Sequence, residues 1–297
     1  MSIKISKMRQ KNAKKRGFGE KRPPIVQKSP LPPAYRAARA GLSLYGQHAV
    51  LAALGNERRQ LHQLFASDRQ AVKLQALAKT HPCPIAPCHL KLLQHIEICD
   101  RDQLNALCAS AHAAEPVHQG IAVHAEPLEE VFLSDILSQA ALLPEQPMRL
   151  MILDQVTDPR NIGAIMRSAQ AFGAAAIVMT RKHAPPETPA LAKTAAGALE
   201  TVPLIRETNL ARALEAMKDA GFMLAGLDAK GTDRLEELSG ETHLGLIMGA
   251  EAGGMRRLTI EACDRLTAIE MTADAESLNV SVAAAIALYA TRPRITS

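Results

Sequence analysis

Between residues 148 and 292, short apolar segments alternate with segments of helical periodicity, and this alternation restricts the fold more than any other feature of the chain. Strands are predicted at 149–153, 175–179, 202–205, 221–227, 243–248 and 266–271. Helices are predicted at 162–172, 190–198, 209–219, 255–262 and 276–289. Apolar strands that alternate with helices form a mostly parallel sheet with both faces covered. We therefore expect an α/β domain whose ligand site lies at the carboxyl ends of its strands.

A smaller α/β unit precedes this domain. Helical segments are expected at 45–54, 69–79, 89–95 and 101–109, strands at 61–66 and 120–124, and a short extended piece at 84–87. Helical spacing between flanking prolines then indicates a connecting helix and linker. The sequence thus predicts a tail at 1–41, a small domain at 42–126, a linker at 127–147 and a second domain at 148–297.

The tail is strongly basic. Its first 40 residues contain twelve Lys or Arg and one acid, so they carry a net charge of +11, although the whole chain carries only +5. This charge density, together with several prolines and almost no apolar periodicity, predicts a disordered segment. Contact with a polyanion, RNA or DNA, is the favoured interpretation, because each neutralised phosphate releases a counterion. A solubilising or cloning-derived tail is the alternative.

Several classes of protein fit the chain poorly. No apolar run approaches the roughly 20 residues that span a bilayer, and the basic N-terminus lacks the apolar region of a secretory signal. The five cysteines are an odd number in a chain long enough to bury a sizeable core, which favours reduced thiols and a cytoplasmic protein. Cys83, Cys88 and His89 lack the spacing of a zinc site, so no metal is expected.

Three loops that follow predicted strands carry the polar chemistry. In the first, residues 158–169, Gly163 and Arg167 fall one turn apart on one helix face, where the arginine can grip a phosphate or a ribose. In the second, 249–254, glycines permit close approach of a ligand and Glu251 adds a carboxylate. The third, 277–281, opens a buried helix with Ser and Asn side chains. Neither GxGxxG nor GxxxxGK[ST] occurs in them, and each feature alone is more often an ordinary turn, a surface ion pair or a helix cap than a ligand site.

Together the three loops resemble the ordered motifs of the SpoU/TrmH family of RNA ribose 2′-O-methyltransferases. The matching residues are Asn161-Ile162-Gly163-Ala164 with Arg167, Met248-Gly249-Ala250-Glu251 with Gly254, and Ser277-Leu278-Asn279-Val280-Ser281-Val282-Ala283. The small domain, with Tyr45-Gly46-Gln47-His48-Ala49-Val50 and Val117-His118-Gln119-Gly120, resembles the substrate-binding domain of the branch that methylates a guanosine of 23S ribosomal RNA.

The resemblance implies a homodimer that binds S-adenosyl-L-methionine in the loops of a trefoil knot and acts on RNA. Gly249, Ile269 and Leu278 match the cofactor-contacting positions of the family. Ala252 and Ala290 depart from its pattern, where glycine and an acidic residue are usual.

The resemblance also implies a set of catalytic residues. Arg167 matches an essential arginine, for which two roles stay open. It is either the general base or a group that orients the phosphate and polarises the hydroxyl, because free guanidinium is a poor proton acceptor. Asn161, Ser277 and Asn279 would position substrate and cofactor, and Glu251 would do so or accept the proton.

Two other functions remain open at this stage. One is a methyltransferase of different specificity, acting on a transfer RNA ribose or on a base. The other is a ribosome-assembly or RNA-binding protein without catalysis. The second would share the basic tail but would not require Arg167 for its function.

Overall fold

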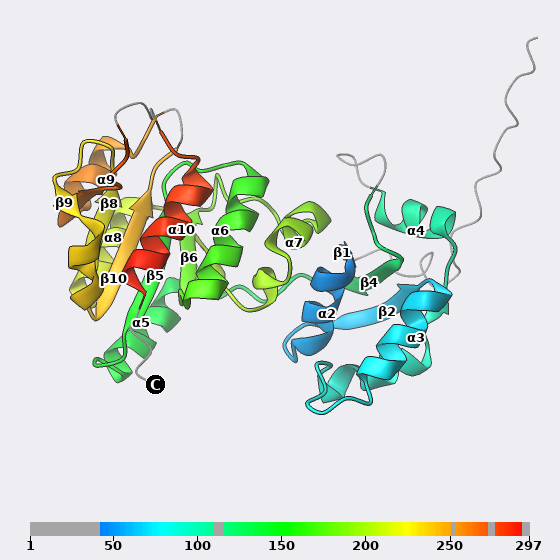
Figure 1. Cartoon of the computed structure of the whole chain (residues 1–297). Helices are drawn as coiled ribbons and strands as arrows, with labels where there is room; N and C mark the ends of the chain where they lie inside the picture. Colours follow the sequence, from blue (N-terminus) through cyan, green and yellow to red (C-terminus); the bar gives the residue numbers. More distant parts are fainter. Residues whose placement is uncertain (1–41, 110–115, 251–252, 273–276, 293–297) are drawn as a thin grey trace, which may run out of the picture.

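The computed structural model describes residues 42–109, 116–250, 253–272 and 277–292. The predicted basic tail lies outside these residues. Within them the chain forms a larger and a smaller sheet, each covered by helices (Figure 1).

The larger sheet has seven strands in the order β7-β6-β5-β10-β8-β11-β9, and every neighbouring pair is parallel. The strands are β5 (Met148–Leu153), β6 (Ala176–Thr180), β7 (Leu204–Glu207), β8 (Met223–Leu227), β9 (Asp233–Arg234), β10 (His243–Met248) and β11 (Arg265–Ala268). Every residue of β5, β6 and β10 is buried, as expected for strands with helices on both sides. The predicted parallel-sheet domain is confirmed.

Helices cover both faces of this sheet. One face carries α6 (Pro159–Phe172), α7 (Pro189–Ala195), the short 3₁₀ helix η2 (Ala198–Glu200) and α10 (Val280–Thr291), and the other carries α5 (Leu133–Leu142), α8 (Leu210–Asp219) and α9 (Arg257–Ala262). Alternate residues of β5 serve the two cores: Met151 packs with the α6 and α10 side, and Leu150 with the α5 and α8 side. A second 3₁₀ helix, η3 (Leu235–Gly240), contacts α10.

The small domain is a four-stranded mixed sheet in the order β1-β4-β2-β3. Its strands are β1 (Leu42–Tyr45), β2 (Leu61–Ala66), β3 (Glu97–Ile98) and β4 (Ile121–Ala125), and its helices are α2 (Gln47–Gly55), α3 (Asp68–Leu77), α4 (Arg101–Cys108) and the 3₁₀ helix η1 (Pro87–Gln94). The predicted small α/β unit is therefore present.

Two local predictions for this unit are wrong. Tyr45 was expected to open a helix, but it ends β1, and Gly46 then turns the chain with a φ of 92° before α2 begins. Residues 84–87 were expected to be extended, but Pro84 and Ile85 form bends and Pro87 opens η1, so only Ala86 has an extended backbone. Short segments like these take their conformation from distant partners, because β1 is held by β4, almost eighty residues away.

The two sheets share one continuous core. Val50 and Ala53 of α2 belong to the same buried cluster as Leu191 and Ala195 of α7. Figure 1 shows α7 between the two sheets. Each sheet draws its strands from one predicted domain, and the domain boundaries themselves stay a prediction.

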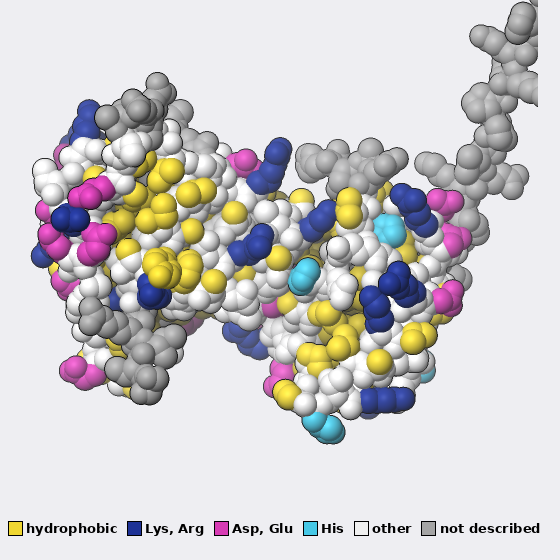
Figure 2. Space-filling view, in the orientation of Figure 1, with side chains coloured by type: hydrophobic (Ala, Val, Ile, Leu, Met, Phe, Trp, Pro, Cys, Tyr) yellow, Lys and Arg dark blue, Asp and Glu magenta, His cyan; other side chains and the backbone are white. Residues whose placement is uncertain are grey.

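One exposed apolar surface lies on α10. Val282, Ile286 and Tyr289 are 47%, 36% and 54% exposed, and the ring of Tyr289 meets that of Phe172 edge-on at 5.6 Å. Figure 2 shows hydrophobic side chains gathered on the face of the larger domain where α10 lies. We call Val282, Ile286 and Tyr289 the α10 stripe.

Two further expectations concern the whole chain. Among the helices in the described part, none has the length and apolar character that crossing a bilayer requires. The knot predicted by resemblance involves loops that include residues 251–252 and 273–276, which lie outside the described residues, so the knot stays a prediction.

Candidate active site

A cavity of about 280 Å³ opens at the carboxyl ends of β8, β10 and β11. This is the edge of the sheet where ligands of open α/β folds bind. Its lining comes from the loops that follow β8, β10 and β11 and from the start of α10: Leu227, Asp228, Ala229, Met248, Gly249, Ala250, Gly254, Thr267, Ile269, Met271, Ser277, Leu278, Val280 and Ala283. The three residues predicted to bind the cofactor, Gly249, Ile269 and Leu278, all line this one cavity.

The loop after β10 needs glycine at its first position. A Cβ on Gly249 would lie 2.1 Å from the carbonyl carbon of Gly254 and 2.3 Å from the amide nitrogen of Met255. Ala250 and Gly254 exchange two backbone hydrogen bonds, of 3.1 and 2.8 Å, and Gly254 has a φ of 62°. The loop therefore doubles back tightly, and it leaves backbone rather than side chains against the cavity. Glu251 and Ala252 lie outside the described residues, so the predicted role of Glu251 stays a prediction.

Asp154 fixes the far end of the same loop. Its carboxylate is fully buried and accepts bonds from the amide and Nε of Arg256, both 2.8 Å, and from Oγ1 of Thr259 at 2.7 Å. The donors of these bonds belong to Arg256 and Thr259, so the bonds hold the segment that follows the Gly254 turn. Asp154 thus has a structural role beside the cavity.

The loop after β8 supplies a carboxylate that the sequence prediction missed. The amide of Asp228 donates to the carbonyl of Thr267 at 3.0 Å, and Oδ1 of Asp228 accepts from the amide of Lys230 at 2.8 Å. Gly231 makes this contact possible, because a Cβ there would lie 2.5 Å from the carbonyl carbon of Thr267. An acidic residue directly after a buried strand was the available signal, since such residues often bind ribose hydroxyls. Thr267 and Met271 were also missed.

The start of α10 joins two of the three sequence motifs. Asn279 caps the helix, and its Oδ1 accepts from the amide and the hydroxyl of Ser281, at 2.9 and 2.5 Å. Its Nδ2 donates to Oδ1 of Asn161, on the first turn of α6, at 3.2 Å. Ser277 and Leu278, just before the cap, line the cavity, and Ser277 is exposed. The structure therefore brings Asn161, Ser277 and Asn279 to one place.

Arg167 is not part of this group. It lies on α6 with its side chain exposed, and it does not line the cavity. No residue in the described ranges forms a hydrogen bond or ion pair with it. Gly163, one turn earlier, lets α7 approach closely, because a Cβ there would lie 2.7 Å from Cβ of Thr194.

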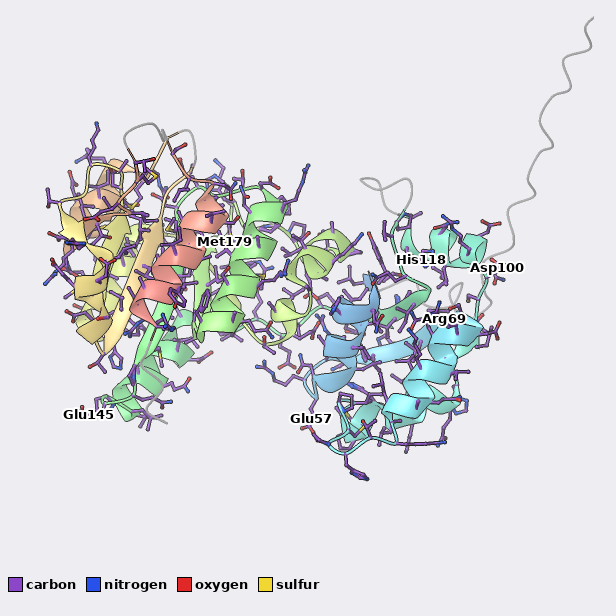
Figure 3. The ribbon with its side chains drawn as sticks, viewed as in Figure 1. Glu57, Arg69, Asp100, His118, Glu145 and Met179 are labelled. Carbon is purple, nitrogen blue, oxygen red and sulfur yellow. The ribbon has the colours of Figure 1, made fainter. Side chains whose placement is uncertain are left out.

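The polar turn before β4 is tightly organised. His118 is buried, its Nδ1 accepts from the amide of Gly120 at 3.0 Å, and burial followed by the charge of Arg101 lowers its pKa. Gln119 has a φ of 56°, and its carbonyl accepts from Gln70 of α3 at 2.9 Å. Figure 3 shows His118 on the small domain near Arg69 of α3.

No metal site was expected at Cys83, Cys88 and His89, and in the structure His89 has other partners. His89 is buried, and its two ring nitrogens each lie 2.9 Å from a backbone carbonyl, those of Leu54 and Arg59. In the part of the chain that the structure describes, no group of three or more His, Cys, Asp or Glu side chains is placed to hold a metal ion.

The cavity fits a ligand with an apolar ring and a polar sugar. Met248, Ile269, Leu278 and Val280 offer apolar surface, and Asp228 with the Gly249 backbone offers polar groups. Its volume is close to the lower end of small-molecule pockets, roughly 300 Å³. These residues suit S-adenosylmethionine, whose adenosine combines both kinds of surface.

Comparison with known proteins gives consistent matches. Residues 148–289 match the model of the SpoU rRNA methylase family. The 23S rRNA (guanosine-2′-O-)-methyltransferase RlmB of Vibrio vulnificus is 38% identical over 260 residues, which cover 86% of this chain and 98% of that protein. An uncharacterized tRNA/rRNA methyltransferase of Synechocystis sp. is 37% identical over 83% of this chain, but the match spans only 61% of its own length.

The fold has a close counterpart among solved structures. The AdoMet-bound rRNA methyltransferase from Sinorhizobium meliloti superposes with a TM-score of 0.67 over 89% of this chain and 91% of that chain, at 21% identity. The likeness therefore includes both the small domain and the parallel-sheet domain.

Proposed function

Because this chain belongs to the SpoU rRNA methylase family, we propose that it transfers a methyl group from S-adenosylmethionine to the 2′-hydroxyl of an RNA ribose. The observation that supports this most directly is the single cavity that contains Gly249, Ile269 and Leu278, with Asn161 and Asn279 bonded to each other at its α10 side. The proposed RNA is 23S ribosomal RNA and the proposed nucleotide a guanosine, as in the name of the Vibrio relative.

The chain's own residues would hold and align the reactants. S-adenosylmethionine supplies an electrophilic methyl group on its sulfonium. The Gly249 backbone and Asp228 would bind the polar part of the cofactor, and Ile269 and Leu278 its apolar part. Ser277 and the Asn161–Asn279 pair would position the ribose. Alignment of this kind can supply much of the acceleration, since effective molarities reach about 10⁵ M or more.

Arg167 is assigned to the substrate in this proposal. Its side chain is exposed, and a guanidinium group has hydrogen-bond donors but no acceptor for a proton. We therefore assign it to bind a substrate phosphate and polarise the attacking hydroxyl. Glu251 would be the alternative acceptor of the hydroxyl proton.

A homodimer is the second part of the proposal. The α10 stripe places Val282, Ile286 and Tyr289 at helical spacing on one face, and exposed apolar patches of this kind mark protein interfaces. A two-fold dimer needs a surface that contacts itself, and a helix face of this type can do so. Such pairing would place α6 and α10 of one protomer beside those of its partner.

Two further proposals concern the segments that bind RNA and the cellular compartment of the protein. We propose that the small domain, residues 42–126, and the basic tail bind RNA. We also propose a cytoplasmic site of action, where five free cysteines are stable as thiols.

A nucleoside digest tests the proposed activity. The protein is incubated with S-adenosylmethionine and with ribosomal RNA made by transcription, and the RNA is then digested to nucleosides. We expect 2′-O-methylguanosine from 23S ribosomal RNA and none from transfer RNA. Absence of any 2′-O-methyl product on both RNAs would overturn the proposal.

The variant Arg167→Ala separates an enzyme from an RNA-binding protein without catalysis. Loss of one group that stabilises developing charge lowers kcat by about 100-fold or more. RNA binding should weaken only slightly, because the small domain and the basic tail keep their proposed contacts with the RNA. If ribosome assembly in cells depends on the protein but is unaffected by this variant, the non-catalytic reading is favoured.

A further inference from the structure

The strongest unexplained feature of the molecule is a buried arginine where the small domain meets the larger one. Arg59 lies between α2 and β2, and its side chain is 0% exposed. A buried arginine is rare unless it is fully paired. Its partners come from outside the small domain's sheet.

Each nitrogen of the Arg59 guanidinium has an acceptor. Nη2 lies 2.5 Å from Oε1 of Glu200, and Nε lies 3.0 Å from Oε2 of the same residue. Nη1 lies 2.5 Å from Oε1 of Glu187 and 2.8 Å from the carbonyl oxygen of Glu126. Glu187 and Glu200 belong to the larger domain, and Glu126 is the last residue of the small domain before the linker, so one side chain joins the two domains next to the linker.

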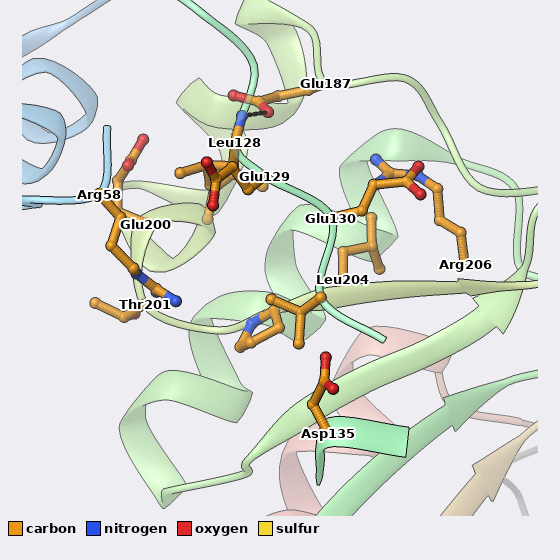
Figure 4. A pocket seen from close by; sticks show the side chains of 13 residues that line it. Arg58, Leu128, Glu129, Glu130, Asp135, Glu187, Glu200, Thr201, Leu204 and Arg206 are labelled. Atoms are coloured by element: carbon orange, nitrogen blue, oxygen red, sulfur yellow. Dashed lines mark hydrogen bonds between the residues drawn. The ribbon is translucent and has the colours of Figure 1, made fainter. Parts of the chain in front are cut away.

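Both carboxylates make a further bond across the junction. Oε2 of Glu200 accepts from Nδ2 of Asn56 in the small domain at 2.8 Å. Oε2 of Glu187 accepts from the amide of Leu128 in the linker at 2.9 Å, as Figure 4 shows. The linker is thus fastened to the larger domain directly beside the Arg59 cluster.

The electrostatics favour a charged and fixed cluster. Burial lowers the pKa of Arg59, but the hydrogen bonds and charges of Glu200 and Glu187 outweigh it and raise the pKa above its ordinary value. Removal of the arginine would leave two carboxylates buried without their cation, which is strongly unfavourable. Lysine is a poor replacement, because a single ammonium group does not reproduce the planar set of donors that spans both carboxylates.

Close packing surrounds the cluster. A Cβ on Gly197, which has a φ of 97°, would lie 2.8 Å from Cβ of Ala52 in α2. Only glycine combines this φ with such an approach, so the helix of the small domain sits directly on the turn before η2. Packing and ion pairs therefore restrain the same junction.

We propose that Arg59 is a positioning residue that holds the small domain at a fixed orientation to the methyltransferase domain, so that one RNA molecule engages both surfaces at once. The expected effect of Arg59 on catalysis rests on the proposed function. An RNA that is bound at one surface meets the second at an effective concentration set by the geometry between them. A loosened junction lowers that concentration and weakens binding, but it leaves the methyl-transfer geometry of the fully engaged complex unchanged.

The test compares Arg59→Met with Arg58→Met in the full-length protein. Arg58 is adjacent and exposed, and it lines the same cavity as Glu187 and Glu200; its variant removes the same charge but leaves the bonds of Arg59 to both carboxylates in place. For intact 23S ribosomal RNA we expect KM to rise about tenfold or more in Arg59→Met, with kcat within about twofold of the parent. For a short RNA hairpin that contains only the target nucleotide and reaches only the larger domain, both constants should be unchanged.

Hydrogen–deuterium exchange measures the junction without reference to activity. The amide of Leu128 is protected by Glu187, so the peptide that contains it should exchange at least about tenfold faster in Arg59→Met than in Arg58→Met. Calorimetry with S-adenosylmethionine verifies that the cofactor site is intact. If Arg59→Met does not fold, Glu187→Gln, which keeps Arg59 and Glu200, should give the same changes in smaller degree.

The outcomes separate this inference from the proposed function. Unchanged exchange at Leu128 and an unchanged KM in a folded Arg59 variant would overturn it. An equal fall of kcat on both RNAs would also contradict it, because that result assigns Arg59 to the active site. If the parent protein methylates no RNA, the proposed function fails, yet faster exchange in the Arg59 variant would still support the fixed junction.

Discussion

Nδ2 of Asn279 donates a hydrogen bond of 3.2 Å to Oδ1 of Asn161, which lies 118 residues earlier in the chain. The bond ties the cap of α10 to the first turn of α6, and it brings two of the three sequence motifs to the edge of one cavity. Asn279 therefore serves both the helix end and the proposed substrate side.

Replacing Asn279 should affect stability and activity together. Asn279→Ala removes a helix cap, which costs about 1 kcal/mol, and it also removes the side-chain bond to Asn161. We expect a lower midpoint in urea unfolding and a fall in kcat of about tenfold or more. The matched control is Ser281→Ala, which loses the hydroxyl bond to Asn279 but keeps the backbone bond. Similar kinetics for the two variants would contradict a positioning role for Asn279.

Gly249 and Gly253 offer a paired test of the cavity loop. A Cβ on Gly249 would meet the backbone at 2.1 Å, but one on Gly253 would meet no atom of the described residues within 4 Å. Gly249→Ala must therefore shift the loop, and we expect the Kd for S-adenosylmethionine to rise about 100-fold. Gly253→Ala should change it less than about twofold. Calorimetric titration measures both, and equal affinities would remove Gly249 from the cofactor site.

Asp228 provides a test of the residue that sequence reasoning missed. Asp228→Asn keeps an oxygen for the amide of Lys230, so the turn should persist, but it removes the charge beside the cavity. A hydrogen bond to a charged group contributes about 1.5–3 kcal/mol, so the Kd for the cofactor should rise about tenfold or more. Asp233→Asn, on the edge strand β9, serves as the control. An unchanged Kd would show that Asp228 does not bind the cofactor.

Sequence reasoning succeeded where the pattern was strong and local. The strands at 61–66 and 243–248, which were predicted from their apolar residues, match β2 and β10 to the residue, and every residue of β10 is buried. The two-residue strands β3 and β9 have no such pattern and exist only through their partners β2 and β11. Their conformation is decided by pairing.

Some residues of the candidate site were predictable from the sequence, and others were not. The positions of Gly249, Ile269 and Leu278 came from a resemblance, and the structure gathers them in one cavity. No local pattern could predict the bond between Asn161 and Asn279, since it depends on how α6 and α10 pack. Asp228 was missed because an acid after a strand is common, and only the cavity distinguishes this one.

The α10 stripe gives a direct test of dimerisation. Ile286→Asp places a charge in the proposed interface, where its burial would be unfavourable, and we expect a monomer by light scattering. Val72→Asp is the control, because Val72 is 66% exposed on α3 of the small domain. A dimer that persists in Ile286→Asp would assign the interface to another surface.

The exposed position of Arg167 leads to a final prediction. Its side chain does not line the cavity of its own chain, and it lies on α6, which packs against α10 beside the proposed interface. We predict that, in a symmetric dimer through that face, each Arg167 reaches the cavity of the partner. Arg167→Ala and Gly249→Ala should each be nearly inactive alone. Co-expressed with different tags and purified as a mixture, they should recover about one quarter of the parent activity, because half of the random dimers would contain one complete site. If Arg167 serves its own chain, no mixed dimer has a complete site, and the mixture should stay inactive.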